Sequence, residues 1–341
     1  MVSMKDIAKK CGVSVATVSK ALNAQKDIGE ETRKRICAAA EEMGYMANSV
    51  ARTLKTNRSY NLGMLFGDET HSILGCEYYT HVMDGFKAEA ESRGYDLTFI
   101  NSRLGEDPAT FARHCRHRGV DGVVVVWVDF EDPRIRALAA AGIPMVTVDH
   151  VLEGHTAVLS DNVRGVETLV RYAYDRGHRK IAYIHGQESA ITRDRLLGFR
   201  QACRELELEI PDDYLIPCAY MDSDLCEEAV RKLMMLEEPP TCILFPDDYS
   251  FISGHYALMV CGFAIPSLAV DDRAISVMGY NGFNLARMIR LTTYTQNGQT
   301  IGRTAAAHLI ERIEHPADFR PEQILVSGAL MEGETVQDIN E

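Results

Sequence analysis

The distribution of apolar and polar positions divides the chain into two stretches of different character. Residues 4–46 hold three short patterns that predict helices over residues 4–11, 15–22 and 29–43. Ser14 is a suitable N-cap for the second helix, and Gly44 closes the third. From Asn61 onward, short continuous apolar runs alternate with amphipathic helical patterns. Such runs, each flanked by helices, are typical of parallel strands buried on both faces.

The second stretch is predicted to form two lobes. Its apolar runs include NLGMLF, DLTFI, DGVVVVWV, PMVTVD, KIAYIHG, YLIPC and TCILF, with helical patterns near 77–93, 108–118, 132–141, 162–176, 190–206 and 222–236. About ten strands over this length exceed what one ordinary doubly wound sheet holds. The predicted fold is therefore an all-α head followed by an α/β body of two doubly wound lobes.

Composition narrows the class of protein. The chain has 341 residues, of which 46% are hydrophobic and 25% charged, the balance of an ordinary globular protein. No apolar run reaches the roughly 18–20 residues of a membrane-spanning helix, and the N-terminus lacks the apolar core of a signal peptide. Nine cysteines without CxxC spacing favour reduced thiols in the cytoplasm. We expect no membrane partner and no cofactor.

The net charge of −13 is unevenly distributed along the chain. Residues 1–60 contain eleven Lys and Arg against six Asp and Glu, whereas the other 281 residues contain 25 against 43. A basic head attracts DNA phosphates, and an acidic body avoids nonspecific contact with them.

Residues 7–23, IAKKCGVSVATVSKALN, have the pattern of a helix–turn–helix. Ala8 supplies the small residue where the helices meet, Gly12 permits the turn, and Ile7 with Val18 joins the helices. The second helix then presents its N-terminal end to base edges and phosphates. The candidate DNA contacts there are Ser14, Val15, Ala16, Thr17, Ser19, Lys20 and Asn23. The alternative is a generic helical hairpin whose exposed residues have no such role.

Residues 4–55 resemble the N-terminal signature of the lactose/galactose repressor family, through MKDIAKKCGVSVATVSKALN, GEETRKRICAAAEEMGY and NSVARTLK. The resemblance implies that Ser49–Lys55 is a hinge helix formed on DNA, with Leu54 wedged into a base step of the minor groove. Asn48, Ala51, Leu54 and Lys55 are then further candidate DNA contacts. Ala47 replaces the proline common before this hinge, which suggests a looser hinge. Alternatively, Leu54 is a linker residue that packs on the body.

The resemblance extends to the C-terminus through GHRKIAYIHG, PPTCILFPDD, VMGYN and LTTYTQNGQTIGRTAAAHLIERI. It implies two periplasmic-binding-protein-like lobes joined by three crossovers, with a ligand in the cleft between them. The implied domains are a helix–turn–helix head (1–47), a hinge and linker (48–60) and an effector-binding and dimerisation body (61–341). The body would divide into an N-lobe, about 61–160 plus 294–325, and a C-lobe, about 161–293 plus 326–341.

Sugars are recognised by carboxylates, amides, arginine and aromatic side chains, and the strand ends of the body carry these types. The candidate effector contacts are Tyr78, Tyr79, Asp149, Arg195, Asp247 and Asn281, with His71 on the preceding loop. Each has an ordinary structural alternative. Arg195 and Asp247 could form a structural ion pair, Asp149 and Asn281 could cap a helix or turn, and His71 could be a surface residue.

Two further clusters have simple structural interpretations. In the pair Asp247-Asp248, one side chain facing the cleft and one capping a helix is favoured over shared ligation of a metal ion. The segment HCRH at 114–117 is interpreted as a solvated helix face. HExxH, GxSxG, Walker and GxGxxG motifs are absent from the sequence. We therefore expect neither a metal site nor an enzyme.

The hypothesis from the sequence is a transcription regulator that binds a palindromic double-stranded operator as a homodimer. A sugar-like effector would shift it between two states, as inducer or as corepressor. Purines, sugar phosphates and a protein corepressor remain alternatives for the effector. The competing hypothesis is a cytoplasmic solute-binding or sugar-processing protein with an incidental helical head. Deletion of residues 1–60 separates the two, because only a regulator would lose its activity.

Overall fold

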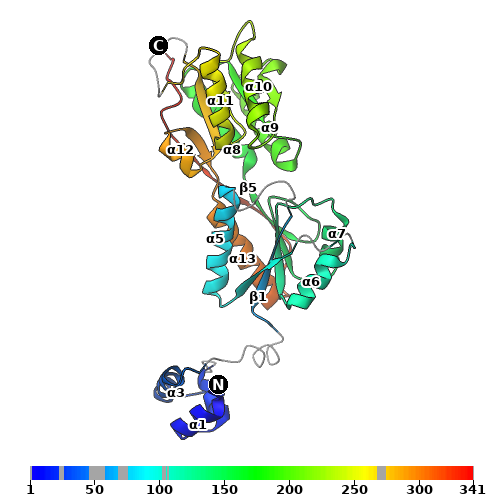
Figure 1. Ribbon diagram of the computed structural model, residues 1–341, viewed down its shortest axis with the longest axis vertical. Helices are drawn as coiled ribbons and strands as arrows, with labels where there is room; N and C mark the ends of the chain where they lie inside the picture. Colours follow the sequence, from blue (N-terminus) through cyan, green and yellow to red (C-terminus); the bar gives the residue numbers. More distant parts are fainter. Residues whose placement is uncertain are drawn as a thin grey trace. The chain divides into compact units, whose positions relative to one another are not determined.

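The computed structural model describes residues 2–22, 27–45, 58–67, 76–101, 105, 107–266 and 274–340. It divides into two compact units, a head (Met1–Ser59) and a body (Tyr60–Glu341) (Figure 1). Within the described ranges, no helix combines the length and the apolar character needed to cross a membrane.

The head contains the three predicted helices, α1 (Met4–Cys11), α2 (Val15–Leu22) and α3 (Glu30–Glu42). Ile7, Val18 and Ile36, one from each helix, are completely buried in one shared hydrophobic cluster. Gly12 ends α1 with a φ of 65°, a conformation that favours glycine. Ser14 caps α2 as predicted, because its Oγ accepts a hydrogen bond from the Thr17 backbone nitrogen at 3.0 Å.

The first lobe of the body is a six-stranded parallel sheet in the order β11-β5-β4-β3-β1-β2. Its strands are β1 (Asn61–Phe66), β2 (Asp96–Ile100), β3 (Gly122–Val126), β4 (Met145–Val148), β5 (Thr156–Ser160) and β11 (Gln323–Val326). One face packs against α5 (Glu77–Ser92) and α13 (Gly298–Glu314). The other face packs against α6 (Thr110–Arg118) and α7 (Pro133–Ala139) (Figure 1).

The second lobe is a six-stranded sheet in the order β12-β10-β9-β8-β6-β7, parallel except for β12. Its strands are β6 (Ile181–His185), β7 (Leu215–Pro217), β8 (Cys242–Leu244), β9 (Ser276–Asn281), β10 (Thr292–Thr295) and β12 (Ala329–Met331). One face is covered by α8 (Asn162–Asp175) and α9 (Ala190–Glu205). The other is covered by α10 (Ser223–Met234) and α11 (Asp248–Val260), with α12 (Asn284–Met288) and a 3₁₀ turn (Asp212–Tyr214) nearby.

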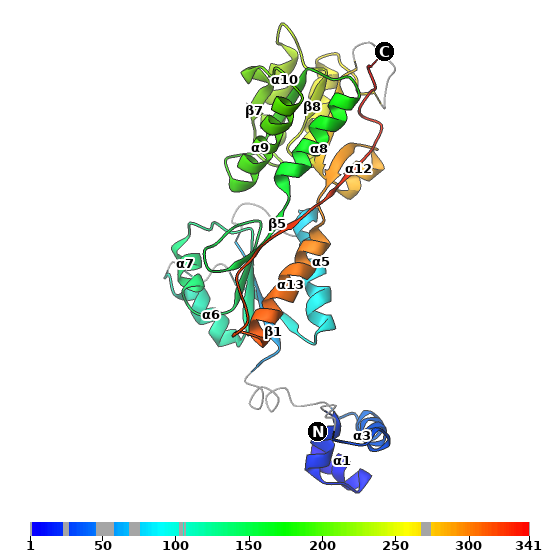
Figure 2. The same ribbon diagram turned by 180° about the vertical axis from the view of Figure 1, so that it is seen from behind.

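The chain crosses between the lobes three times (Figure 2). The first crossing lies at Asp161, between β5 and α8, and the third lies at Ser327–Gly328, between β11 and β12. The second follows β10, at Gln296–Asn297. From the sequence, the chain is expected to return to the N-lobe near residue 294. This is slightly too early, because β10 continues through Thr295 in the second sheet.

Helix α11 is not evident from the sequence pattern. Its segment, DYSFISGHYALMV, is apolar around most of its circumference, so no amphipathic period marks it. One side, including Phe251 and Leu258, is buried in the lobe. The opposite side exposes Ile252, Tyr256, Met259 and Val260, each with 46–57% of its surface accessible.

Helices α5 and α13 approach each other closely through glycines. A Cβ atom on Gly85 would lie 2.0 Å from the Gln299 carbonyl oxygen, and one on Gly302 would lie 1.9 Å from the Val82 carbonyl oxygen. Both contacts are with backbone atoms, which cannot move aside without shifting a helix. Side chains at these two positions are therefore excluded by the packing of the first lobe.

Gly302→Ala is expected to lower the free energy of unfolding of the body by about 1–3 kcal/mol, because the added methyl group forces α13 away from α5. Urea unfolding followed by circular dichroism measures the change. Arg303→Ala, at the exposed neighbouring position, is the control and should leave the midpoint nearly unchanged. Equal midpoints for the two variants would show that the helices can separate at little cost.

Candidate ligand-binding cleft and DNA-reading helix

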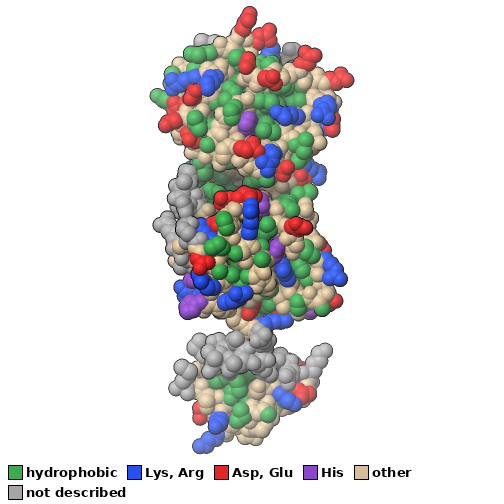
Figure 3. Space-filling model, turned by 90° about the vertical axis from the view of Figure 1, so that its right-hand side faces the viewer, with side chains coloured by type: hydrophobic (Ala, Val, Ile, Leu, Met, Phe, Trp, Pro, Cys, Tyr) green, Lys and Arg blue, Asp and Glu red, His purple; other side chains and the backbone are tan. Residues whose placement is uncertain are grey.

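A cavity of about 620 Å³ lies between the two lobes of the body. The first lobe contributes residues of α5 and residues that follow β3 and β4. The second contributes residues that follow β6, β7 and β8, and the last residue of β9. Carboxyl ends of parallel strands are where open α/β sheets bind ligands. Outside this cleft, acidic and basic side chains are interspersed over one face of the body (Figure 3).

All six described candidates for effector contact line this single cavity: Tyr78, Tyr79, Asp149, Arg195, Asp247 and Asn281. They come from five different segments of both lobes. The seventh candidate, His71, lies outside the described residues.

The cavity wall contains several residues with left-handed backbone conformations. Trp127, Asp149, Met221 and Asn281 have φ angles of 47°, 54°, 60° and 107°, respectively. Non-glycine residues rarely adopt positive φ, and the cost is of order 1–3 kcal/mol for each. Trp127, Asp149 and Asn281 each stand at the end of a strand. Their unusual backbone conformation therefore sets the direction of these side chains at the edge of the sheet.

Asp149 belongs to a hydrogen-bonded network beneath the cavity. Its carboxylate accepts hydrogen bonds from Tyr78 Oη and from the Ser160 backbone nitrogen, the latter at 2.8 Å. Gln296 Nε2 donates to Ser160 Oγ at 2.9 Å, and this hydroxyl also contacts Tyr78 Oη at 3.0 Å. Burial raises the pKa of the Asp149 carboxyl, although its hydrogen bonds oppose the shift.

Arg195 is held rigidly with only 4% of its surface accessible. Its Nε donates to Asn162 Oδ1 at 2.9 Å, and Nη1 donates to the Pro246 carbonyl oxygen at 3.0 Å. The guanidinium also lies over the Tyr280 ring, 3.7 Å from its centroid. Nη2 makes no hydrogen bond to any described residue, so it is available to a ligand in the cavity that Arg195 lines.

Asp247 has an extensive structural role. Oδ1 accepts hydrogen bonds from the backbone nitrogens of Tyr249 and Ser250, which makes Asp247 the N-cap of α11. Oδ2 accepts from Ser250 Oγ at 2.8 Å and from the Met221 backbone nitrogen at 3.0 Å. The two described side chains Arg195 and Asp247 form no ion pair; Asp247 instead caps the helix and holds Met221 in the wall.

Asp248 points into the second lobe and is completely buried. Its carboxylate accepts hydrogen bonds from Thr293 Oγ1 at 2.7 Å and from the Phe283 backbone nitrogen at 2.8 Å. These bonds fix the turn that follows β9 and therefore the position of Asn281. Among the described residues, no group of three or more His, Cys, Asp or Glu could hold a metal ion.

Sequence reasoning missed an aromatic part of the wall. Trp127 stacks on Tyr79 with centroids 4.6 Å apart, and Phe130 stacks on His150 at 3.7 Å. Tyr220, from the second lobe, lies over Arg195. The missed residues line the same cavity as the predicted ones. Trp127 lies near the end of the predicted strand DGVVVVWV, and His150 directly follows the predicted strand PMVTVD, so their places at strand ends could have marked them.

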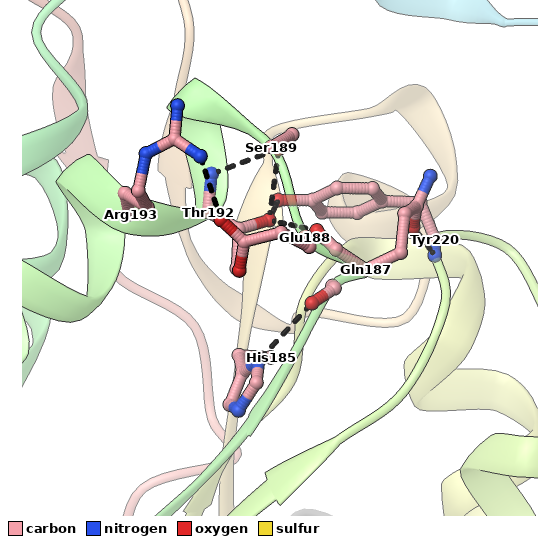
Figure 4. Close-up of polar contacts among 8 residues, drawn as sticks. His185, Gln187, Glu188, Ser189, Thr192, Arg193 and Tyr220 are labelled. Atoms are coloured by element: carbon pink, nitrogen blue, oxygen red, sulfur yellow. Dashed lines mark hydrogen bonds and ion pairs between the residues drawn. The ribbon is translucent and has the colours of Figure 1, made fainter.

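The loop after β6 supports the wall of the second lobe (Figure 4). Gln187 Oε1 accepts a hydrogen bond from the Tyr220 backbone nitrogen at 2.9 Å, and Thr192 Oγ1 contacts Tyr220 Oη at 2.9 Å. Ser189 caps α9 through the Thr192 backbone nitrogen. On the outer side of the helix, Arg193 pairs with Glu188 at the surface.

In the head, α2 and its N-cap residue carry six of the candidate DNA contacts: Ser14, Val15, Ala16, Thr17, Ser19 and Lys20. Val15, Ala16 and Lys20 are exposed along the helix. Lys20 forms an ion pair with Asp27, which DNA phosphates would have to displace. The remaining candidates, Asn23, Asn48, Ala51, Leu54 and Lys55, lie outside the described residues.

Two family models match the chain. Residues 3–48 match the bacterial regulatory proteins of the lacI family, and residues 59–327 match the periplasmic binding proteins and sugar binding domain of the LacI family. The HTH-type transcriptional repressor PurR of Vibrio parahaemolyticus is 29% identical over 321 residues, covering 92% of each chain.

Solved structures share the fold. The lac repressor dimer bound to operator and the anti-inducer ONPF superposes with a TM-score of 0.74 at 21% identity, covering 98% of this chain and 99% of that one. The transcriptional regulator CelR in complex with cellobiose gives a TM-score of 0.72 at 22% identity, covering 98% and 100%. The helical head and the two-lobed α/β body predicted from the sequence are thereby confirmed.

Proposed function

Since the chain belongs to the LacI family of transcription regulators, we propose that it represses transcription from a palindromic operator under the control of a sugar-like effector bound between its lobes. Regulators of this family bind DNA and small-molecule effectors, and the matched relatives are transcriptional repressors rather than enzymes. The proposal adds the class of effector, the homodimer and a cytoplasmic location.

The observation that supports the effector class most strongly is the composition of the cleft. Asn281 and the free Nη2 of Arg195 offer hydrogen-bond donors, and Asp149 offers an acceptor, around one cavity. Aromatic rings line the same space. Hydroxyl groups pair with such donors and acceptors, and the apolar face of a sugar ring packs on aromatic rings.

Both lobes contribute to the cavity, so the affinity of a ligand depends on how far the cleft is closed. A ligand that binds the closed and open forms differently shifts the population between them. The ligand acts as inducer or as corepressor depending on which of the two forms binds operator DNA more tightly.

The experiment is a fluorescence-anisotropy titration of the protein against DNA upstream of its own gene, at fixed salt, with and without sugars. We expect salt-sensitive specific binding that one sugar shifts about tenfold or more. Specific binding that no sugar alters would exclude a sugar as the effector. Nucleotides and a protein corepressor would then be the remaining candidates. Failure to bind this DNA, or any selected palindrome, would contradict the regulator itself and favour the solute-binding alternative.

Homodimer formation is supported by the exposed side of α11. Ile252, Tyr256, Met259 and Val260 occupy positions i, i+4, i+7 and i+8, which form one face of a helix. A contiguous exposed apolar face marks an interaction surface. Regulators that read two half-sites of a palindrome do so as dimers, and we assign this face to contact with a second copy of the chain.

Met259→Asp is expected to weaken the dimer about tenfold or more, because two carboxylates would be desolvated at the interface. Sedimentation equilibrium measures the dissociation constant. Met235→Asp is the matched control, since Met235 is 84% accessible and follows α10 as its C-cap residue, outside the α11 face. Equal dissociation constants for the two variants would place the dimer contact elsewhere.

A further inference from the structure

Two aromatic stacks stand in the wall that the first lobe contributes to the cleft. Trp127 lies on Tyr79 with an angle of 15° between the rings. Phe130 lies on His150 with an angle of 6°. All four residues line the cavity, so each stack offers flat apolar surface to a ligand.

The two stacks are anchored on opposite faces of the first-lobe sheet. Trp127 and Tyr79 pack into the cluster formed with α5 and α13. Phe130 belongs to the cluster formed with α6 and α7 on the other face. The cavity therefore extends across the carboxyl edge of the sheet, from one layer of helices to the other. Because the two stacks belong to the cores on opposite faces of the sheet, a ligand with two rings suits them better than one with a single ring.

Polar groups are distributed along the same path. Asp149 immediately precedes His150 and accepts a hydrogen bond from Tyr78 of α5, while Asp222 and Asp224 line the cavity from the second lobe. Arg195 is the only Lys or Arg among the described residues that line the cavity. Its charge is outnumbered by the carboxylates, so the cleft does not favour an anionic ligand. Burial lowers the pKa of His150, which keeps its imidazole neutral near pH 7.

We propose, on the basis of the function proposed above, that the effector is a neutral disaccharide. One sugar ring packs at the Trp127–Tyr79 stack within reach of Arg195, and the second packs on the Phe130–His150 stack. Each sugar ring has one face of C–H groups and a rim of hydroxyls, which matches aromatic surfaces flanked by donors and acceptors. His150 is accordingly the residue that distinguishes a disaccharide from a monosaccharide.

The test uses the full-length protein and its single tryptophan, Trp127, whose fluorescence reports on the cavity directly. Cellobiose, lactose, maltose, melibiose, sucrose and trehalose are titrated alongside glucose, galactose and fructose. We expect one disaccharide to bind about tenfold or more tightly than either of its component monosaccharides. His150→Ala should reduce the affinity for that disaccharide about tenfold and leave the weaker monosaccharide binding unchanged within about twofold.

His117→Ala is the matched control, because His117 is an exposed histidine of the same lobe on α6, outside the cavity. Thermal unfolding verifies that the variants are folded. If His150→Ala proves unstable, Phe130→Leu provides the same test, since it keeps an apolar core residue and removes the ring that supports His150.

The proposal is overturned if a monosaccharide binds as tightly as every disaccharide, if His150→Ala weakens both classes equally, or if no saccharide changes the fluorescence. The operator titration separates these results from the function itself. A monosaccharide that releases or tightens operator DNA supports the regulator and refutes the disaccharide. Loss of operator binding under all conditions refutes the regulator, whatever binds in the cleft.

Discussion

Replacement of Arg195 by methionine is expected to weaken effector binding about a hundredfold and to leave operator binding without effector nearly unchanged. Arg195 lines the cavity with a charged donor that no described protein group uses. A hydrogen bond from a charged donor contributes about 1.5–3 kcal/mol, which corresponds to roughly ten- to hundredfold in affinity. Loss of the Asn162 and Pro246 contacts misplaces neighbouring residues and adds to the effect.

Anisotropy titrations with labelled operator, repeated at increasing effector concentration, measure both affinities for the Arg195→Met variant. Arg193→Met is the matched control, because Arg193 lies two residues earlier on α9 and pairs with Glu188 at the surface. We expect the control to respond to effector as the unaltered protein does. An Arg195→Met variant with a normal effector response would show that the guanidinium is only a structural part of the second lobe.

The second large effect is a dependence of the free energy of unfolding on pH, caused by Asp248. Burial raises the pKa of its carboxyl from 3.8 to about 7 in the folded protein. Between about pH 4 and pH 7, the folded state therefore binds more protons than the unfolded state. The protonated carboxyl stabilises the folded state near pH 4, and this stabilisation is lost as the pH rises through 7. This one group can lower the free energy of unfolding by up to about 4 kcal/mol over that window.

Asp248→Asn is expected to flatten this dependence, because an amide does not ionise. Thr293 Oγ1 can reverse its hydroxyl and accept the new N–H, while the amide oxygen accepts from the Phe283 backbone nitrogen. Urea unfolding at pH 5 and pH 8, followed by circular dichroism, gives the difference for each protein. Asp224→Asn, at an exposed position, should retain the full pH dependence. An unchanged pH dependence in Asp248→Asn would assign it to other groups.

The elements that the sequence predicts are those marked by residues close to one another in the chain. Ser14 and Gly12 define the turn between α1 and α2 by their chemistry alone. Asp149 and Asn281 at strand ends, and Arg195 on the helix that follows β6, were expected to converge, because parallel strands present their carboxyl ends at the same edge. The structure places them around one cavity, while their contact with an effector stays a prediction.

What the sequence did not reveal depends on contacts between distant segments. Helix α11 is apolar on both its buried side and its exposed side, so no periodicity marked it. The stack of Phe130 on His150 joins the ends of two different strands. Asp247 and Asp248 are adjacent in the chain, yet only the fold decides that the first caps α11 at the cavity and the second holds the Phe283 turn.

The network around Asp149 has a mechanical consequence. Ser160 precedes the first crossing between the lobes, and Gln296 forms part of the second, so two of the three connections share one cluster of hydrogen bonds. A ligand hydroxyl group that bound Asp149 would compete with Tyr78 and would free Ser160 and Gln296 to change partners. The stiffness of the connections between the lobes would then depend on what fills the cavity, so that a ligand would change the resistance to lobe rotation as well as the preferred angle.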